Sequence, residues 1–183
     1  AEAGQVTVGV LACTALPLQA NSSRGVICMP SQGQGTVMLS LAGGEARQIR
    51  VNGAADRLQL RRIESVESTH SDRRQQERLD KLLGLTQATI QMDSQAKYGT
   101  VARGEADLYL RIPLPQFSRK RENIWDHAAG SIAIEEAGGR VTDLDGKPLD
   151  FSRGAKLSDN RGIVASNGAI HEQVLEAIST MTV

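Results

Sequence analysis

The chain has 183 residues, with 21 basic and 21 acidic side chains, so its formal net charge is zero. A balanced charge gives no general attraction for nucleic acid or for an anionic membrane surface. No apolar run approaches the roughly 18 residues that a membrane span needs, and residues 1–4 do not begin a signal peptide. We therefore expect a cytoplasmic globular protein that has neither nucleic acid nor membrane as a partner.

The first part of the chain shows short apolar segments separated by glycine-rich turns. The expected strands are 5–13, 26–29, 36–41 and 47–51, with Pro30 ending the second. Strands of this length joined by tight turns predict an antiparallel meander. The two cysteines, Cys13 and Cys28, lack zinc-motif spacing, so free, buried thiols are expected.

From residue 58 onward, expected strands alternate with expected helices. The strands are 58–66, 88–92, 108–112, 140–142 and 163–166, and the helices are 72–83, 95–103, 126–137 and 169–180. This alternation predicts an α/β fold in which helices flank a mixed, partly parallel sheet. We expect residues 1–183 to form a single domain.

The expected helix 72–83 carries an apolar stripe and ends at Gly84. The stripe consists of Leu79, Leu82 and Leu83. Its charged residues are Arg73, Arg74, Glu77, Arg78, Asp80 and Lys81. The simplest interpretation is that these charges form a solvated face.

Several polar residues stand where strands end and helices begin, which is where α/β sheets bind ligands. Ser94 and Lys97 open the helix 95–103, and a hydroxyl with a lysine at a helix start suits an anion. Arg111 ends an apolar strand, from which its guanidinium could bind a phosphate or turn out to solvent. His70 follows the strand 58–66 and could serve either packing or binding.

Asp126 comes at or near the start of a segment rich in small residues. Ala129, Gly130, Ala133 and Ala137 follow helical spacing, so one face of this helix could approach another backbone closely. A carboxylate at a helix start commonly caps the free N–H groups. It is also a suitable ligand for a hard cation such as Mg²⁺, and the two interpretations are compatible.

The segment that contains Asp126 resembles a known family signature. Trp125-Asp126-His127-Ala128-Ala129-Gly130 is followed by Glu136-Ala137-Gly138-Gly139, by Thr142-Asp143 and by Pro148-Leu149-Asp150-Phe151. This series resembles the C-terminal signature of the inositol monophosphatase superfamily, whose members are magnesium-dependent, lithium-sensitive phosphatases. The resemblance implies that Asp126 is a metal ligand for Mg²⁺.

A second set of motifs resembles one branch of that superfamily. Asp93-Ser94-Gln95-Ala96-Lys97-Tyr98 and Ala106-Asp107-Leu108-Tyr109-Leu110-Arg111 look like those of the 3′(2′),5′-bisphosphate nucleotidases, whose fungal members are similar over nearly the whole chain. The resemblance implies that Ser94, Lys97 and Arg111 hold the phosphate and ribose of a nucleotide, and that His70 lies beside its base. The implied substrate is adenosine 3′,5′-bisphosphate, with the sulfate-activated nucleotide as a second.

Other motifs of the family are absent from this sequence. The family draws further metal ligands from a Glu-Glu pair and an Asp-Pro-Ile/Leu-Asp-Gly-Thr motif that precede the part seen here. The chain has no Asp-Pro dipeptide, and its only Glu-Glu pair is Glu135-Glu136 within the later signature. We therefore expect a C-terminal half without its N-terminal metal-binding half, and nearly inactive alone, since one carboxylate holds Mg²⁺ weakly.

Three functions stay open at this point. The first is a nucleotidase, or its C-terminal part, with an inositol phosphate phosphatase as the alternative within the enzyme class. The second is a non-catalytic module that binds nucleotides through Ser94, Lys97 and Arg111 without a metal. The third is an assembly fragment that pairs with a separate N-terminal chain, which predicts an exposed apolar patch.

Overall fold

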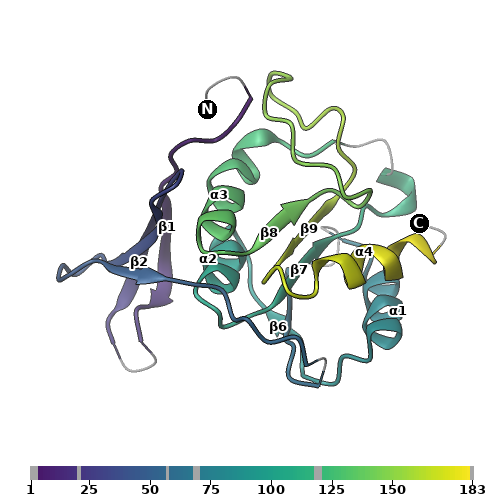
Figure 1. Cartoon of the computed structure of the whole chain (residues 1–183), viewed down its shortest axis with the longest axis horizontal. Coiled ribbons are helices and arrows are strands. Elements are labelled where there is room, and N and C mark those ends of the chain that lie inside the picture. The colour runs from purple at the N-terminus through teal and green to yellow at the C-terminus, as the bar shows by residue number, and fades with distance from the viewer. Residues whose placement is uncertain (1–3, 20–21, 57, 68–70, 118–120, 182–183) are drawn as a thin grey trace.

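The computed structural model describes residues 4–19, 22–56, 58–67, 71–117 and 121–181. Two sheets and four α-helices alternate as layers (Figure 1). The helices α2 and α3 lie between the sheets, where α2 contacts β1 and β7 and α3 contacts β2 and β8. The helices α1 and α4 pack together beside the second sheet, on the side away from the first. The helix bounds are α1 (Arg73–Leu83), α2 (Ala96–Ala102), α3 (Ala128–Glu136) and α4 (His171–Ser179).

The first sheet is the expected antiparallel meander, with strand order β1-β2-β3-β4. Its strands are β1 (Leu11–Pro17), β2 (Arg24–Ser31), β3 (Gly35–Ser40) and β4 (Arg47–Ile49). The strand expected at 5–13 was misplaced, because regular pairing begins only at Leu11, opposite Cys28. The expected stop at Pro30 was also wrong, since Pro30 pairs with Thr36 of β3 and its carbonyl accepts from Gly9 N–H. A proline is tolerated so near the end of a strand because little of the ladder depends on its missing N–H.

The second sheet is mixed, as expected, with strand order β6-β5-β7-β9-β8. Its strands are β5 (Arg62–Glu64), β6 (Ile90–Gln91), β7 (Leu108–Arg111), β8 (Arg140–Thr142) and β9 (Ile163–Ser166). The strand β5 runs parallel to β6 and β7, whereas β9 runs antiparallel to β7 and β8. The parallel pairs bring the ends of β5, β6 and β7 to one edge of the sheet, where the candidate site forms.

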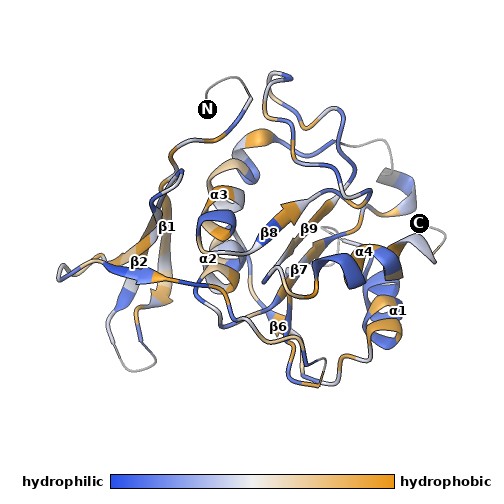
Figure 2. Cartoon of the chain, viewed as in Figure 1, coloured by the Kyte–Doolittle hydropathy of each residue, from blue (hydrophilic) through white to orange (hydrophobic). Residues whose placement is uncertain are grey.

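Two apolar clusters hold these layers together. One fills the space around α2 and α3 between the sheets and includes Tyr98, Val101 and Ile134; the other lies under α1 and α4 and includes Leu79, Val174 and Ile178. Figure 2 shows hydrophobic residues along β8 and β9 and a mixture of polar and apolar residues along α1. Cys13 and Cys28 are free and buried in the first cluster, as predicted.

The first sheet is apolar on both faces. Val26, Cys28 and Met38 are fully buried toward α2 and α3. The alternate residues Ile27, Met29, Val37 and Leu39 are half-buried, and Val10 beyond them is 64% exposed. Within the described part of the chain, no helix covers this outer face (Figure 1). An apolar face of this kind suits contact with a further layer.

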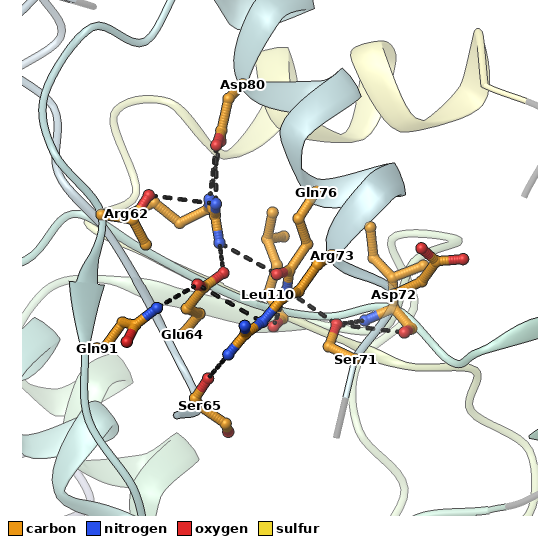
Figure 3. Close-up of polar contacts among 12 residues, drawn as sticks. Arg62, Glu64, Ser65, Ser71, Asp72, Arg73, Gln76, Asp80, Gln91 and Leu110 are labelled. Carbon is orange, nitrogen blue, oxygen red and sulfur yellow. Dashed lines mark hydrogen bonds and ion pairs between the residues drawn. The ribbon is translucent and has the colours of Figure 1, made fainter. Parts of the chain in front are cut away.

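The charged residues of α1 are not all solvated, contrary to expectation. Arg62 of β5 is 4% exposed and donates from all three guanidinium nitrogens, to both Asp80 oxygens, Glu64 Oε2, Gln76 Oε1 and Thr89 Oγ1. Figure 3 shows Asp80 of α1 above the Arg62 guanidinium, with Gln76 of α1 and Glu64 of β5 reaching it from below. The periodicity of the sequence predicted the apolar stripe of α1. It could not predict this buried network, because Arg62 lies on a separate strand.

The caps of α1 follow the sequence closely. The Asp72 side chain accepts from the N–H groups of Arg74 and Gln75, and Gly84 ends the helix in the left-handed conformation. Leu82 departs from the expected stripe because it is 50% exposed, whereas Leu79 and Leu83 are buried. None of the described helices is long and apolar enough to cross a membrane.

Candidate active site

One cavity of about 550 Å³ gathers most of the residues that the sequence singled out. Ser94, Lys97, Arg111 and Asp126 all line it, although they come from segments up to 32 positions apart. Its other lining residues are Val10, Leu11, Ala12, Gln95, Tyr98 and Tyr109. His70 lies outside the described residues, so its expected place beside a base stays a prediction.

Ser94 shapes the entry to α2 through its backbone. It has φ 66°, which is uncommon for a residue with a side chain, and its hydroxyl accepts from Ala96 N–H at 3.1 Å. The Ser94 hydroxyl therefore caps α2 from one residue before the N-cap position, Gln95, whose own side chain makes no capping hydrogen bond. The Gln95 amide instead donates to Trp125 O at 2.9 Å, which joins this turn to the segment containing Asp126.

Lys97 points back from the first turn of α2 and is 4% exposed. Its Nζ donates to Ser94 O at 2.9 Å and to Met92 O at 3.2 Å, and lies 5.4 Å from the centre of the Tyr109 ring. Burial lowers the pKa of Lys97 to about 8, against the opposing effect of Asp93, and the nearby Arg111 lowers it further. A cation held in this way, with no ion pair to a carboxylate among the described residues, is ready to receive an anion.

Arg111 lies at the end of β7 with its side chain 18% exposed, so it does not simply turn out to solvent. Its Nε is 2.9 Å from Glu122 Oε1, an ion pair. The N–H direction misses that oxygen, however, so among the described residues Nε is buried without a hydrogen bond. Burial opposes its charge, but Tyr109 and Glu122 outweigh this and raise the pKa of Arg111. The guanidinium is thus a permanent cation at the cavity wall.

Asp126 ends a 3-10 helix (Ile124–Asp126) and does not cap α3. The helix α3 begins at Ala128, its N-cap is His127, and no side chain makes a capping hydrogen bond there. Asp126 Oδ2 instead accepts from Asn123 Nδ2 at 2.8 Å. The capping interpretation is therefore wrong in detail, and the half-buried carboxylate of Asp126 remains available to the cavity.

Three residues beside the site had no function assigned from the sequence. Glu122 contacts both Arg111 and His127, and His127 Nδ1 lies 2.7 Å from the Tyr98 hydroxyl. Tyr98 and His127 stand inside the two motifs, so their position was a usable signal. Glu122 follows the basic run 119–121 in a loop, and nothing in its local sequence marks it.

A small residue at position 130 allows α3 to pack closely against α2. A Cβ added to Gly130 would lie 2.3 Å from Tyr98 Cγ, a distance that no side chain tolerates. Gly130 therefore lets α3 pack directly on the aromatic ring of Tyr98 in α2, as the helical spacing of small residues suggested. This close approach places Asp126, just before α3, at the same cavity as Lys97 on α2.

The described residues supply one carboxylate to a metal at this cavity. No group of three or more histidine, cysteine, aspartate or glutamate side chains that could hold a metal occurs in the described part of the chain. Magnesium is held by one or two carboxylates together with waters and substrate phosphates. These residues therefore fit one ligand position, that of Asp126, and do not by themselves form a metal site.

The cavity combines two cations and one carboxylate around a volume that suits a small anionic molecule. Lys97 presents a point charge, and Arg111 can present the fork that matches phosphate oxygens. Asp126 in the same cavity would repel an anion unless a cation lay between them. The arrangement therefore favours a phosphorylated ligand accompanied by a divalent cation.

Two curated fungal proteins with similar sequences share a name. The chain is 39% identical over 187 residues to a 3′(2′),5′-bisphosphate nucleotidase from Schizosaccharomyces pombe, with 99% of the chain and 52% of that protein covered. It is 37% identical over 194 residues to the Emericella nidulans protein of the same name, with 97% and 54% covered. The chain thus spans about half the length of these curated relatives.

Solved structures agree on the fold. An inositol monophosphatase from Anabaena superposes with a TM-score of 0.59 at 24% identity, over 86% of this chain and 61% of that one. The model of the inositol monophosphatase family matches residues 1–182. With this match over almost its whole length and the α/β layers that its relatives share, the chain belongs to the inositol monophosphatase family.

Proposed function

We propose that the cavity binds a nucleotide carrying a 3′-phosphate, and that the chain is the substrate-binding part of a magnesium-dependent phosphatase. The reaction proposed is hydrolysis of adenosine 3′,5′-bisphosphate to AMP and phosphate. The observation that carries this is the convergence of Lys97, Arg111, Ser94 and Asp126 on one cavity. The names of the relatives support the nucleotide as substrate.

In this proposal the two cations bind phosphate oxygens. Lys97 Nζ donates to two carbonyl oxygens and would bind one phosphate as a point charge. Arg111 would bind phosphate oxygens through its guanidinium fork. Ser94 is exposed at the rim, where its backbone and hydroxyl can meet phosphate or ribose. The buried Gln95 Oε1, which has no hydrogen bond among the described residues, is free to accept from a ribose hydroxyl.

Asp126 is proposed as one magnesium ligand. When bound, Mg²⁺ would neutralise phosphate charge and activate water. Since this part of the chain offers a single carboxylate at the cavity, further ligands must come from elsewhere, as the half-length match to the relatives allows. The uncovered apolar face of the first sheet is a natural contact for such a partner. We expect the 183-residue chain alone to be nearly inactive.

A non-catalytic nucleotide-binding module is the second candidate. The single carboxylate at the cavity favours this candidate, because one carboxylate does not form a metal site by itself. Lys97 and Arg111 can bind phosphate without a metal. An inositol phosphate phosphatase is the alternative substrate class. Competition between adenosine 3′,5′-bisphosphate and inositol 1-phosphate for the cavity would separate these substrates.

The test is calorimetric titration of adenosine 3′,5′-bisphosphate into the chain, with and without Mg²⁺, repeated with Lys97→Ala. We expect binding that Mg²⁺ strengthens and that Lys97→Ala weakens by tenfold or more, because a buried charge-assisted contact contributes about 1.5–3 kcal/mol. Lys147→Ala, at a turn that does not line the cavity, is the control and should bind normally.

The outcomes separate the candidates. Binding that is indifferent to Mg²⁺ would favour the non-catalytic module, and tighter binding of inositol 1-phosphate would favour the other substrate class. Absence of nucleotide binding under both conditions would contradict a preformed site in this chain. Magnesium-dependent phosphate release at ordinary enzyme turnover would contradict the expected inactivity of the chain alone.

A further inference from the structure

Glu122 stands between two elements of the candidate site without lining the cavity itself. Its Oε1 is 2.9 Å from Arg111 Nε, and its Oε2 is 3.3 Å from His127 Nε2. The carboxylate is 14% exposed, so neither contact is a solvated surface pair. Burial alone would raise its pKa, but the His127 hydrogen bond and the Arg111 charge outweigh this and lower the pKa of Glu122. Glu122 is therefore an ionised carboxylate shared by two partners.

The second partner is held in turn by Tyr98. The Tyr98 hydroxyl lies 2.7 Å from His127 Nδ1, and the two rings meet edge to face with centroids 6.0 Å apart. A carboxylate can only accept, so His127 Nε2 carries a hydrogen and donates to Glu122. His127 Nδ1 and the Tyr98 hydroxyl then share the second hydrogen bond of the ring, and burial raises the pKa of Tyr98.

This chain of contacts joins two segments that line the cavity. Arg111 ends β7, and His127 directly follows Asp126, the last residue of the 3-10 helix. Arg111 Nε makes no aligned hydrogen bond among the described residues, so the Glu122 charge is what orients its guanidinium there. A rigid Glu122 thus fixes the direction of the Arg111 fork relative to the Asp126 carboxylate.

We propose that Glu122 is a positioning residue, which His127 and Tyr98 lock in place so that Arg111 meets the phosphate beside Asp126. The proposal rests on the proposed function only in naming the phosphate of a nucleotide as the group that Arg111 binds. Glu122 itself touches no ligand in this scheme, and it acts through Arg111.

Glu122→Gln is the sharpest substitution because it keeps the shape of the side chain. An amide can accept from only one of the two partners through its oxygen, and it lacks the negative charge that pairs with the Arg111 guanidinium. We expect affinity for adenosine 3′,5′-bisphosphate to fall about tenfold or more, and the same substitution in an Arg111→Ala background to have no further effect. Tyr98→Phe removes only the hydroxyl that contacts His127 and should weaken binding roughly two- to tenfold.

A second readout does not depend on ligand binding. The Nε–Hε groups of Arg111 and Arg62 can be followed in one nitrogen-15 NMR spectrum, through their heteronuclear NOE and hydrogen exchange. Glu122→Gln should increase the motion and exchange of the Arg111 signal and leave that of Arg62 unchanged. Asp80→Asn is the matched control, since the Asp80 carboxylate accepts from Arg62 Nε, and it should affect Arg62 alone.

The two readouts distinguish the possible failures. If the parent chain binds nucleotide and Glu122→Gln binds equally well, or if the two substitutions are additive, the positioning role is wrong. If the parent chain binds nothing, the proposed function fails, and the NMR comparison alone decides on Glu122. An Arg111 signal as ordered in Glu122→Gln as in the parent chain would then overturn the proposal.

Discussion

Arg62 is the first residue of β5, and Arg111 is the last residue of β7, the parallel strand beside it. The two arginines nevertheless have different partners. Arg62 of β5 donates to two carboxylates, an amide and a hydroxyl, and its side chain is 4% exposed. Arg111 of β7 has one described ion pair, with Glu122, and its side chain is 18% exposed at a cavity. The first guanidinium is saturated by its own protein, and the second retains donors for a ligand.

The number of acceptors that converge on each arginine accounts for this difference. The strand β5 faces α1, which brings Asp80 and Gln76 to Arg62 (Figure 3). Although burial opposes its charge, Asp80 and Glu64 raise the pKa of Arg62. The end of β7 faces the loop that contains Glu122 and otherwise opens to the cavity. A buried cation with too few acceptors is a better sign of a binding site than a buried cation alone.

The largest effect is expected from Arg62→Ala, which should lower the free energy of unfolding by about 3–5 kcal/mol. The substitution leaves Glu64 and Asp80 without their shared partner in a buried place. Urea unfolding would measure the change. Arg161→Ala breaks the exposed pair with Asp145 and should cost about 0–1 kcal/mol. Equal losses of unfolding free energy in the two variants would show that the buried Arg62 network stabilises the fold no more than an exposed ion pair does.

Arg111→Ala should reduce nucleotide affinity strongly and stability only slightly. We expect the free energy of unfolding to fall by about 1–2 kcal/mol, because the cavity admits water to the Glu122 left behind and His127 still donates to it. Nucleotide affinity should fall tenfold or more, as charge-assisted phosphate contacts are lost. Urea unfolding and calorimetry on the same preparations would test both. A variant as unstable as Arg62→Ala but with normal affinity would show that Arg111 is structural.

The smallest effect concerns Lys97. Its pKa of about 8 is lowered by burial and, to a lesser degree, by Arg111. Phosphate binding needs the protonated amine, so affinity should hold below pH 8 and decline as pH rises through that value. Arg111→Ala should raise the pKa of Lys97, which a carbon-13 NMR titration of the Lys97 Cε would report. A midpoint that Arg111→Ala leaves unchanged would mean that the two cations do not share one site.

Local sequence signals predicted most of the elements. Asp72 and Gly84 bound α1 where the chain indicated, because capping depends on neighbours in sequence. The alternation of strands and helices gave the mixed sheet. The errors came where tertiary contacts decide, as at Pro30, which continues β2, and at Leu82, which is exposed on α1.

For the candidate site, the motifs identified Ser94, Lys97, Arg111 and Asp126, and the fold gathers all four at one cavity. The position of Asp126 at the start of the expected helix also suggested a cap that the structure does not form. Glu122 could not have been found from the sequence, because its partners Arg111 and His127 lie 11 and 5 positions away in separate elements.

The sequence by itself determined the kinds of element, their order and the chemical groups available for binding. These follow from local backbone preferences and from the resemblance of short motifs. Only the tertiary structure decided which charges are paired and which are left open, because burial and the count of nearby acceptors depend on segments far apart in the chain. That decision makes Arg62 a structural residue and leaves Arg111 facing the cavity.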